Sequence, residues 1–355
     1  MKINYHAPIN QTGYGVASFN ILKALLQKQI NISYFPIHNP SVTSQEDYDL
    51  IVHLIRMNSH LDPKAPCVKI WHQFDLASRI GNGEYIAYPF FELDSFNTLE
   101  KNHLNIPDKL IASSKWAQQV YQMNGCNKPS SVVPLGVDLS IFNHNTITKT
   151  RQDDKYVFLS IGKWEVRKGH DLLPQIFTQA FPDAKDVELW ILASENISSY
   201  SSAEEIVNWK NKYKIDDRIK IMPEVPTHKD IAQLIANSNC GLYISRAEGW
   251  NLELLETMAM NKPAIATNYS AHTEFCNKEN SYLIDIESIE PAYDGKAFKG
   301  QGNWAKIGQN QIDQTIEHMR YLYSNRIKTN TNGVETANKY SWQNSADHLL
   351  RCIMN

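Results

Sequence analysis

The stretch Glu248-Gly-Trp-Asn-Leu-Glu-Leu-Leu-Glu256 follows a short apolar, β-branched run, Cys240 to Ser245, that is typical of a buried strand. From Asn251 to Met260 the apolar residues recur at helical spacing, and an asparagine suits the N-cap position before such a helix. The sequence therefore predicts a strand, a turn and a helix in succession. This is the unit from which parallel α/β sheets are built.

The two outer glutamates of this stretch are candidates for binding. Glu248 falls in the loop at the strand's carboxyl end, where open α/β sheets bind ligands. Glu256 lies about five residues into the helix, roughly 7–8 Å along the axis, and its side chain leans back toward the helix start. A carboxylate beside an apolar stripe needs hydrogen bonds, which ribose hydroxyls would supply. Spacing alone leaves open a solvated helix with incidental glutamates, as Glu253 is expected to be.

A second turn of the same kind lies upstream. A strand predicted at 156–161 runs into Gly162-Lys163-Trp-Glu-Val-Arg-Lys168-Gly169, and a helix is predicted from Gly169 to Phe181. Lys163 and Lys168, with Arg167 beside the latter, place cations next to a helix start, which suits a diphosphate. A solvated basic loop is the alternative.

The composition describes an ordinary globular chain. With 355 residues, two domains are expected, and 42% hydrophobic with 21% charged residues is sufficient for sizeable cores. A formal net charge of −3 gives no electrostatic basis for a nucleic-acid partner or for anionic lipid. Five cysteines without CxxC spacing indicate reduced thiols, and neither a signal peptide nor a membrane-spanning run is recognisable. We expect a soluble, cytoplasmic protein.

Strands and helices alternate along the chain, which predicts two doubly wound α/β domains with mainly parallel sheets. A polar tract, Asn143 to Asp154, is expected to link them. The predicted domains are residues 1–148 and 149–340, followed by a terminal helix in 341–355. The other predicted strands are 2–9, 31–37, 49–55, 68–74, 85–91, 109–112, 130–134, 187–193, 219–224 and 264–268. The other predicted helices are 16–29, 95–102, 114–124, 204–213, 228–237, 306–324, 333–339 and 341–352.

A glycine loop follows the first predicted strand. Gly13 and Gly15 would let the backbone approach a phosphate or sugar at a helix N-terminus. Ser18 replaces the third glycine of a dinucleotide fingerprint, and the strand at 31–38 lacks the acidic residue that binds a dinucleotide ribose. These departures argue against an NAD enzyme, and a tight structural turn remains the alternative.

Two further features bear on catalysis and metal binding. His72 ends a predicted strand and should face the ligand side of the first sheet, although a lone histidine is more often structural. Asp47 and Asp49 have the spacing of the DXD signature that holds a metal in one class of nucleotide-sugar transferases. They precede an apolar run instead of ending one, so we expect solvated residues at a strand entry and no metal site.

Taken together, these motifs resemble the retaining glycosyltransferases of family 4. Glu248 to Glu256 has the form of the family's E-x7-E motif, and residues 160–169 resemble its G-R-x4-K-G phosphate turn. Val133-Pro-Leu-Gly-Val-Asp138 resembles its P-x-G-V-D segment, and residues 112–117 its S-x-W/F-x turn. The resemblance implies the GT-B fold, in which two Rossmann-like doubly wound domains face each other across a cleft, with the terminal helix returning to the first domain.

The resemblance also implies roles for individual residues. Glu248 would bind hydroxyls of the transferred sugar, Glu256 the nucleotide ribose, and Lys168 the diphosphate. Lys163 stands where the family usually has arginine, which keeps the charge but loses bidentate geometry. The implied catalytic set is His72, Lys163, Lys168 and Glu248. The implied donor-binding set is Gly13, Gly15, Gly162, Val225, Gly249, Trp250, Asn251, Leu252 and Glu256.

Trp250 and Asn251 replace the family's usual Phe-Gly. The implied reaction transfers a sugar, by default a hexose, from a UDP- or GDP-sugar to a glycan, lipid-linked or small-molecule acceptor. It needs no metal or other cofactor and at most peripheral membrane association. A nucleotide-sugar epimerase, a phosphorylase or a non-catalytic sugar-nucleotide-binding protein on the same fold are the alternatives. Loops at 88–94 and 300–304 are candidates for acceptor contact, with ordinary loop packing equally open.

Overall fold

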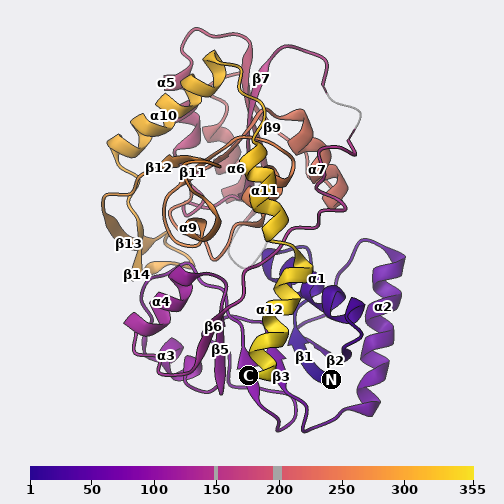
Figure 1. Ribbon diagram of the computed structural model, residues 1–355. Coiled ribbons are helices and arrows are strands. Elements are labelled where there is room, and N and C mark those ends of the chain that lie inside the picture. The colour runs from indigo at the N-terminus through magenta and orange to yellow at the C-terminus, as the bar shows by residue number, and fades with distance from the viewer. Residues whose placement is uncertain (148–150, 195–201) are drawn as a thin grey trace. The chain divides into compact units, whose positions relative to one another are not determined.

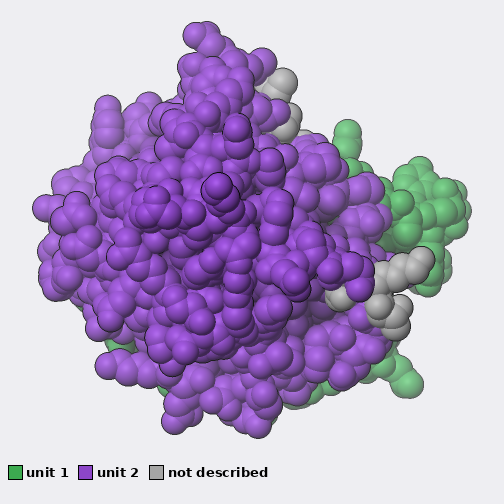
Figure 2. All heavy atoms as spheres, turned by 90° about the horizontal axis from the view of Figure 1, so that it is seen from above, with its two compact units in different colours: residues 1–136, 340–355 green, residues 137–339 purple. Residues whose placement is uncertain are grey.

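The computed structural model describes residues 1–147, 151–194 and 202–355, and Figure 1 shows their helices and strands. The chain forms two compact units, coloured separately in Figure 2. The first unit comprises residues 1–136 and 340–355, and the second comprises residues 137–339. The domain boundary predicted at residues 148 and 149 lies outside the described residues.

The first unit is built on a six-stranded, all-parallel sheet with the order β2-β1-β3-β4-β5-β6. The order reverses between β1 and β3, so the connections leaving these two strands diverge. The strands are β1 (Lys2–Ala7), β2 (Asn31–Pro36), β3 (Cys67–Lys69), β4 (Tyr85–Ala87), β5 (Lys109–Ala112) and β6 (Ser130–Val132). The helices are α1 (Gly13–Gln27), α2 (Gln45–Arg56), η1 (Met57–His60), α3 (Thr98–Leu104), α4 (Lys115–Met123) and α12 (Trp342–Met354).

The C-terminal helix α12 belongs to the first unit and packs beside α1 (Figure 1). Its buried residues recur at helical spacing: Trp342, Ser345, Ala346, Leu349 and Leu350. A Cβ atom on Gly136 would lie 2.3 Å from the Trp342 backbone nitrogen, so only glycine permits this approach. The end of the chain is therefore tied to the segment that closes the first unit.

The strand predicted at 49–55 is wrong, because this segment is the helix α2. Ser44 caps that helix by accepting a hydrogen bond from the Asp47 amide, and Glu46 and Asp47 occupy its first turn. Only Ile51 and Leu54, three residues apart, are buried, and α2 packs on β2. A six-residue apolar run does not distinguish strand from helix, and the capping signal decided the outcome.

The second unit has a six-stranded parallel sheet with the order β12-β11-β10-β7-β8-β9, which reverses between β7 and β10. Its strands are β7 (Tyr156–Lys163), β8 (Val187–Ser194), β9 (Ile219–Ile221), β10 (Cys240–Tyr243), β11 (Ala264–Thr267) and β12 (Tyr282–Ile284). Its helices are α5 (Leu173–Ala180), α6 (Ala203–Lys212), α7 (His228–Asn237), α8 (Leu252–Ala259), α9 (His272–Phe275), α10 (Gln309–Ser324) and α11 (Thr331–Lys339).

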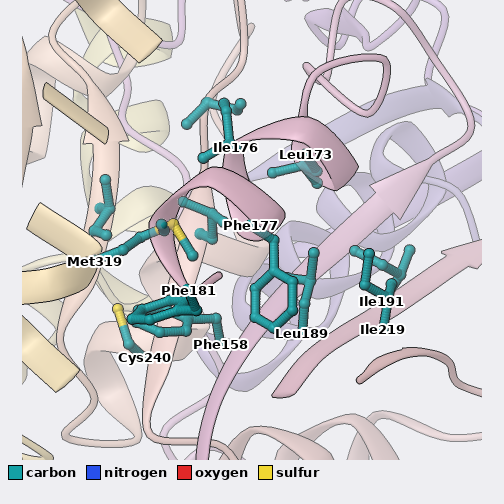
Figure 3. Close-up of a cluster of buried hydrophobic side chains, with 14 of the residues drawn as sticks. Phe158, Leu173, Ile176, Phe177, Phe181, Leu189, Ile191, Ile219, Cys240 and Met319 are labelled. Atoms are coloured by element: carbon teal, nitrogen blue, oxygen red, sulfur yellow. The ribbon is translucent and has the colours of Figure 1, made fainter. Parts of the chain in front are cut away.

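The core of the second unit lies between this sheet and its helices (Figure 3). Phe158 of β7 and Leu189 of β8 meet Phe177 of α5 and Met319 of α10, all fully buried. The first six residues of β7 are buried without alternation, as expected for a central parallel strand covered on both faces. This packing fixes the ends of β7 and β10, from which the candidate site is built.

The candidate loop at 300–304 is instead part of β14 (Lys299–Ala305), which pairs with β13 (Ile289–Tyr293) as an antiparallel hairpin. Trp304 is buried, and the Ala305 amide donates to the Arg246 carbonyl at 2.9 Å. Turn residues Gly300 and Gly302 concealed this strand in the sequence. Among the described residues, no helix has the length and apolar character needed to cross a membrane.

Candidate functional site

Two turns of the second unit leave the sheet where its strand order reverses. One follows β7 and carries residues 163–169, and the other follows β10 and carries residues 244–251. Because the flanking connections run to opposite faces at such a point, the ends of these strands are where open α/β sheets bind ligands. The positions predicted from the sequence for the phosphate turn and the paired glutamates therefore share one end of one sheet.

Glu248 joins the two turns through a buried charge network. Its Oε1 lies 2.8 Å from Lys168 Nζ, and its Oε2 lies 2.8 Å from Arg167 Nη1. The Ser245 hydroxyl donates to Oε1 at 2.6 Å, and the Glu248 amide donates to Ser270 Oγ at 2.8 Å. The side chain is 5% exposed. An ionised carboxylate has about four acceptor positions. Lys168, Arg167 and Ser245 occupy three of them, which leaves about one for a ligand hydroxyl.

The charge states of this network follow from its geometry. Burial would raise the pKa of Glu248, but Lys168 and Arg167 outweigh it and hold that pKa well below the usual range. Burial would lower the pKa of Lys168, yet Glu248 raises it above its ordinary value. Both members of the pair are therefore charged at neutral pH.

Arg167 was not among the predicted site residues, although it lies within the quoted turn. Its guanidinium contacts Glu248, Glu165 Oε2 at 2.8 Å and the Ala247 carbonyl at 2.8 Å. A planar guanidinium presents five N–H donors in a rigid fork, so it can serve several acceptors at once with fixed geometry. The signal that could have identified it is its position next to Lys168 in the cationic turn.

The two predicted lysines lie in different environments. Lys163 ends β7 with an exposed side chain, which forms no ion pair among the described residues. The side chain of Lys168 is 10% exposed, and its stem lies over Gly162, where an added Cβ would come to 3.4 Å from it. Gly169 follows with φ +76° and lies so close to the Ile244 carbonyl that a Cβ would come within 2.6 Å. This glycine turns the chain immediately after Lys168.

Asn251 caps α8, as the sequence predicted. Its Oδ1 accepts a hydrogen bond from the Leu254 amide at 3.2 Å, and its backbone is left-handed, with φ 84°. Trp250 is buried and packs on Phe275, with ring centroids 4.9 Å apart. The tryptophan ring therefore belongs to the core. Gly249 before it is also buried, and Leu252 is the first residue of the helix.

Glu256 lies in the second turn of α8 and is buried. Its carboxylate accepts no hydrogen bond and forms no ion pair with the part of the chain that the structure describes. Burial raises the pKa of Glu256 well above its usual range, and the nearby charges of Glu253 and Asp138 raise it further. A buried acid without a partner costs stability unless another group hydrogen-bonds to it.

His272, at the start of α9, was not predicted from the sequence. It is fully buried, and its Nε2 lies 2.9 Å from the Asn251 side-chain nitrogen. Its Nδ1 lies 2.9 Å from the Thr267 carbonyl. Burial lowers the pKa of His272, so the ring is neutral at pH 7. Nothing in the spacing of residues 248–256 indicates a contact with position 272.

In the first unit, the glycine loop and His72 also meet where the strand order reverses. The Tyr14 and His72 ring centroids are 4.6 Å apart, and Trp71 lies equally close to His72. A Cβ on Gly15 would lie 2.2 Å from the Asn10 backbone nitrogen, whereas one on Gly13 would meet nothing within 4 Å. Gly15 therefore has a structural role, and Gly13 is free of steric constraint.

The remaining predicted positions lie elsewhere. Val225 is half-buried in the loop between the edge strand β9 and α7. Asp47 lies on α2, 3.8 Å from Lys23 Nζ, and Asp49 accepts a hydrogen bond from Gln45 at 2.8 Å. Within residues 1–147, 151–194 and 202–355, no group of three or more His, Cys, Asp or Glu side chains could hold a metal ion.

Comparison with known proteins shows what this arrangement is similar to. Residues 155–294, which include both turns, match the model of the family described as glycosyl transferases group 1. The chain is also 21% identical over 194 residues to the serotype-specific mannosyltransferase WbdA of Escherichia coli. That match covers 55% of this chain but only 20% of the relative, so the matched segment corresponds to about a fifth of the longer protein.

Solved structures define the fold. Sucrose-phosphate synthase from Thermosynechococcus elongatus superposes with a TM-score of 0.72 at 14% identity, covering 99% of this chain and 98% of the other. HepE from Anabaena, solved in complex with UDP and glucose, gives a TM-score of 0.65 at 14% identity over 100% and 99%. The protein has the GT-B fold with two Rossmann-like parallel sheets. The match of residues 155–294 to the group 1 family model supports glycosyltransferase activity.

Proposed function

We propose that the protein is a retaining, metal-independent glycosyltransferase that moves a hexose from a UDP- or GDP-sugar to a hydroxyl of a glycan, lipid-linked or small-molecule acceptor. The observation that carries the proposal is the Lys168–Glu248–Arg167 network at the carboxyl ends of β7 and β10. It combines fixed positive charge with a carboxylate that keeps one acceptor position, which suits a phosphate linked to a sugar.

The donor would lie along the two turns of the second unit. Lys168 retains ammonium protons beyond the one directed at Glu248, and these would contact the diphosphate. The exposed Lys163 would add a second cation on a flexible stem. Glu248 would accept from a hydroxyl of the transferred sugar. The buried carboxylate of Glu256, which has no hydrogen-bond partner among the described residues, would accept hydrogen bonds from the two ribose hydroxyls.

The remaining donor contacts come from backbone. Gly162, Gly249, Asn251 and Leu252 border the two turns, and their backbone amides are assigned to phosphate oxygens. The Val225 backbone is assigned to the base. In the first unit, Gly13, Gly15 and His72 are assigned to the acceptor and the transferred sugar.

The bond changes balance without a protein nucleophile. The acceptor oxygen bonds to the anomeric carbon on the face from which the diphosphate departs, and the diphosphate leaves with the electron pair of the broken bond. The acceptor hydroxyl's proton passes to the departing phosphate. Lys168 and Lys163 stabilise the charge that develops on the diphosphate, an electrostatic role in which fixed charges are effective.

A donor panel with product separation tests this function. UDP- and GDP-sugars are incubated with glycan acceptors, and the nucleotide and sugar products are separated by chromatography. A glycosyltransferase produces nucleoside diphosphate together with an extended acceptor of retained anomeric configuration. An epimerase produces an isomerised sugar, a phosphorylase requires phosphate, and a binding protein shifts its melting temperature without turnover. Any of these last three outcomes contradicts the proposal.

A further inference from the structure

His272 is a fully buried titratable residue in direct contact with the candidate donor turn, and the proposed chemistry does not use it. Its two ring nitrogens face Asn251 Nδ2 and the Thr267 carbonyl, each at 2.9 Å. The ring comes from α9, beyond β11, whereas Asn251 starts α8. The imidazole therefore connects two segments that are separate in the sequence.

The contacts determine which ring nitrogen carries the proton. The Thr267 carbonyl can only accept, so Nδ1 must donate to it. The Thr267 hydroxyl is also 3.3 Å from Nδ1, but its proton is directed at the Ser245 carbonyl, 2.6 Å away. Nε2 of the neutral ring is then an acceptor for the Asn251 amide group, whose oxygen is left to accept from the Leu254 amide.

The result is a continuous hydrogen-bonded chain from Ser245 through Thr267, His272 and Asn251 to Leu254. Its two ends lie on either side of the turn that carries Glu248. Ser245 also donates to Glu248 Oε1. Asn251 adopts a left-handed backbone that non-glycine residues rarely take, so its side-chain bonds help to hold that conformation.

We propose that His272 is a positioning residue for the donor site, whose neutral imidazole orients the Asn251 amide and thereby holds the turn 248–251 and the start of α8. The identity of the bound donor rests on the proposed function. The hydrogen bonds from Ser245 to Leu254 do not depend on that function. The related motif has glycine where this chain has Asn251. A glycine has no side chain, so His272 could not hold it by a hydrogen bond.

Protonation would break this arrangement. A charged ring would direct an N–H at the Asn251 NH2 group, placing two donors face to face. The charged groups acting on the ring are Glu248, which favours protonation, and Lys168 and Arg167, which oppose it. Burial is the largest effect and keeps the ring neutral, so the positioning should persist at neutral pH and fail only in acid.

Two matched variants test the proposal. His272→Gln places its side-chain oxygen near the position of Nε2 and can still accept from Asn251, whereas His272→Asn is too short to reach it. We expect His272→Asn to bind UDP or GDP roughly 10-fold more weakly and to speed amide hydrogen exchange in a peptide spanning 248–256. His272→Gln should keep nearly wild-type nucleotide affinity and nearly wild-type amide exchange in this peptide, because it can still accept from Asn251.

The Asn251→Gly background decides whether the effect passes through Asn251. There the difference between the two His272 variants should vanish in both affinity and exchange, because the partner side chain is gone. Equal behaviour of the two variants, or an undiminished difference in this background, overturns the proposal. If the wild-type protein binds neither nucleotide, the proposed function fails, while the exchange data still decide whether His272 positions the turn. Should His272→Asn not fold, amide exchange over 248–256 is compared in wild-type, Asn251→Gly and His272→Gln proteins. Faster exchange in Asn251→Gly alone supports the proposal, and equal exchange in all three overturns it.

Discussion

Lys168 Nζ lies 2.8 Å from Glu248 Oε1, and this ion pair connects the turn after β7 with the turn after β10. The proposed roles of the two residues differ: Lys168 binds the diphosphate and Glu248 binds the transferred sugar. Their contact means that a change at either position alters the charge and the placement of the other. Mutations in this pair must therefore be interpreted together.

Lys168→Ala should lower sugar transfer by about 100-fold or more, because it removes a fixed cation from the developing charge of the leaving group. The variant should fold, since Arg167 still pairs with Glu248. Transfer rates are measured on protein whose circular dichroism matches the wild type. The control is Lys185→Ala, which should be fully active. Lys185 is exposed and precedes the amino end of β8, whereas the candidate site lies at the carboxyl ends of the strands. Near-normal activity of folded Lys168→Ala would refute the assignment.

Glu248→Gln should destabilise the ligand-free protein by about 3 kcal/mol, because two buried cations lose their shared carboxylate. The lowered pKa of Glu248 means that its stabilisation is present above the unfolded pKa of about 4.3 and is lost as the pH falls below it. Melting temperatures from pH 3 to 8 should show the largest deficit near neutrality and a shrinking one in acid. A deficit that grows in acid would show that the ion pair is not its source.

Glu256→Gln should have the opposite effect on stability. The raised pKa of Glu256 means that the wild type loses stability as the pH rises above about 4.3, and glutamine avoids this cost. The ligand-free variant should therefore be more stable by about 1 kcal/mol at pH 7–8 and no more stable below pH 4. Thermal unfolding checks this, and calorimetry should show weakened nucleotide binding.

The control for that experiment is Glu253→Gln, one turn earlier on the same helix and partly exposed. Glu253→Gln should change the thermal stability and the nucleotide affinity much less than Glu256→Gln does. A Glu256→Gln protein that melts lower than the wild type at pH 7 would mean that the carboxylate already has a stabilising role without ligand.

Transfer activity should persist in excess EDTA, because the lysines and Arg167 supply the positive charge near the leaving group. Rates with and without added divalent cation provide the measurement. Strict dependence on added metal would contradict the proposal and direct attention to Asp47 and Asp49 on α2. Asp47→Asn and Asp49→Asn variants would then separate binding from an indirect effect.

Much of the fold was readable from local pattern. Residues 240–259 carry a buried β-branched run, an asparagine cap and helical spacing, and the structure confirms the strand, the cap and the helix. Residues 49–55 and 300–304 were misassigned because a short apolar run is ambiguous and because glycines can lie within a strand. At 49–55 the helix cap at Ser44 and packing on β2 decided the outcome, and at 300–304 the pairing of β14 with β13 decided it.

The sequence by itself determined the two α/β repeats, the order of the motifs and the residue types available for binding. Those properties depend on periodicity and spacing within some 20 residues. Only the tertiary structure decided that Lys168 and Arg167 neutralise Glu248, that Glu256 has no partner among the residues the structure describes, and that His272 holds Asn251. These contacts join residues 21 to 81 positions apart. The strand order of the sheet brings them together, and no local pattern records that order.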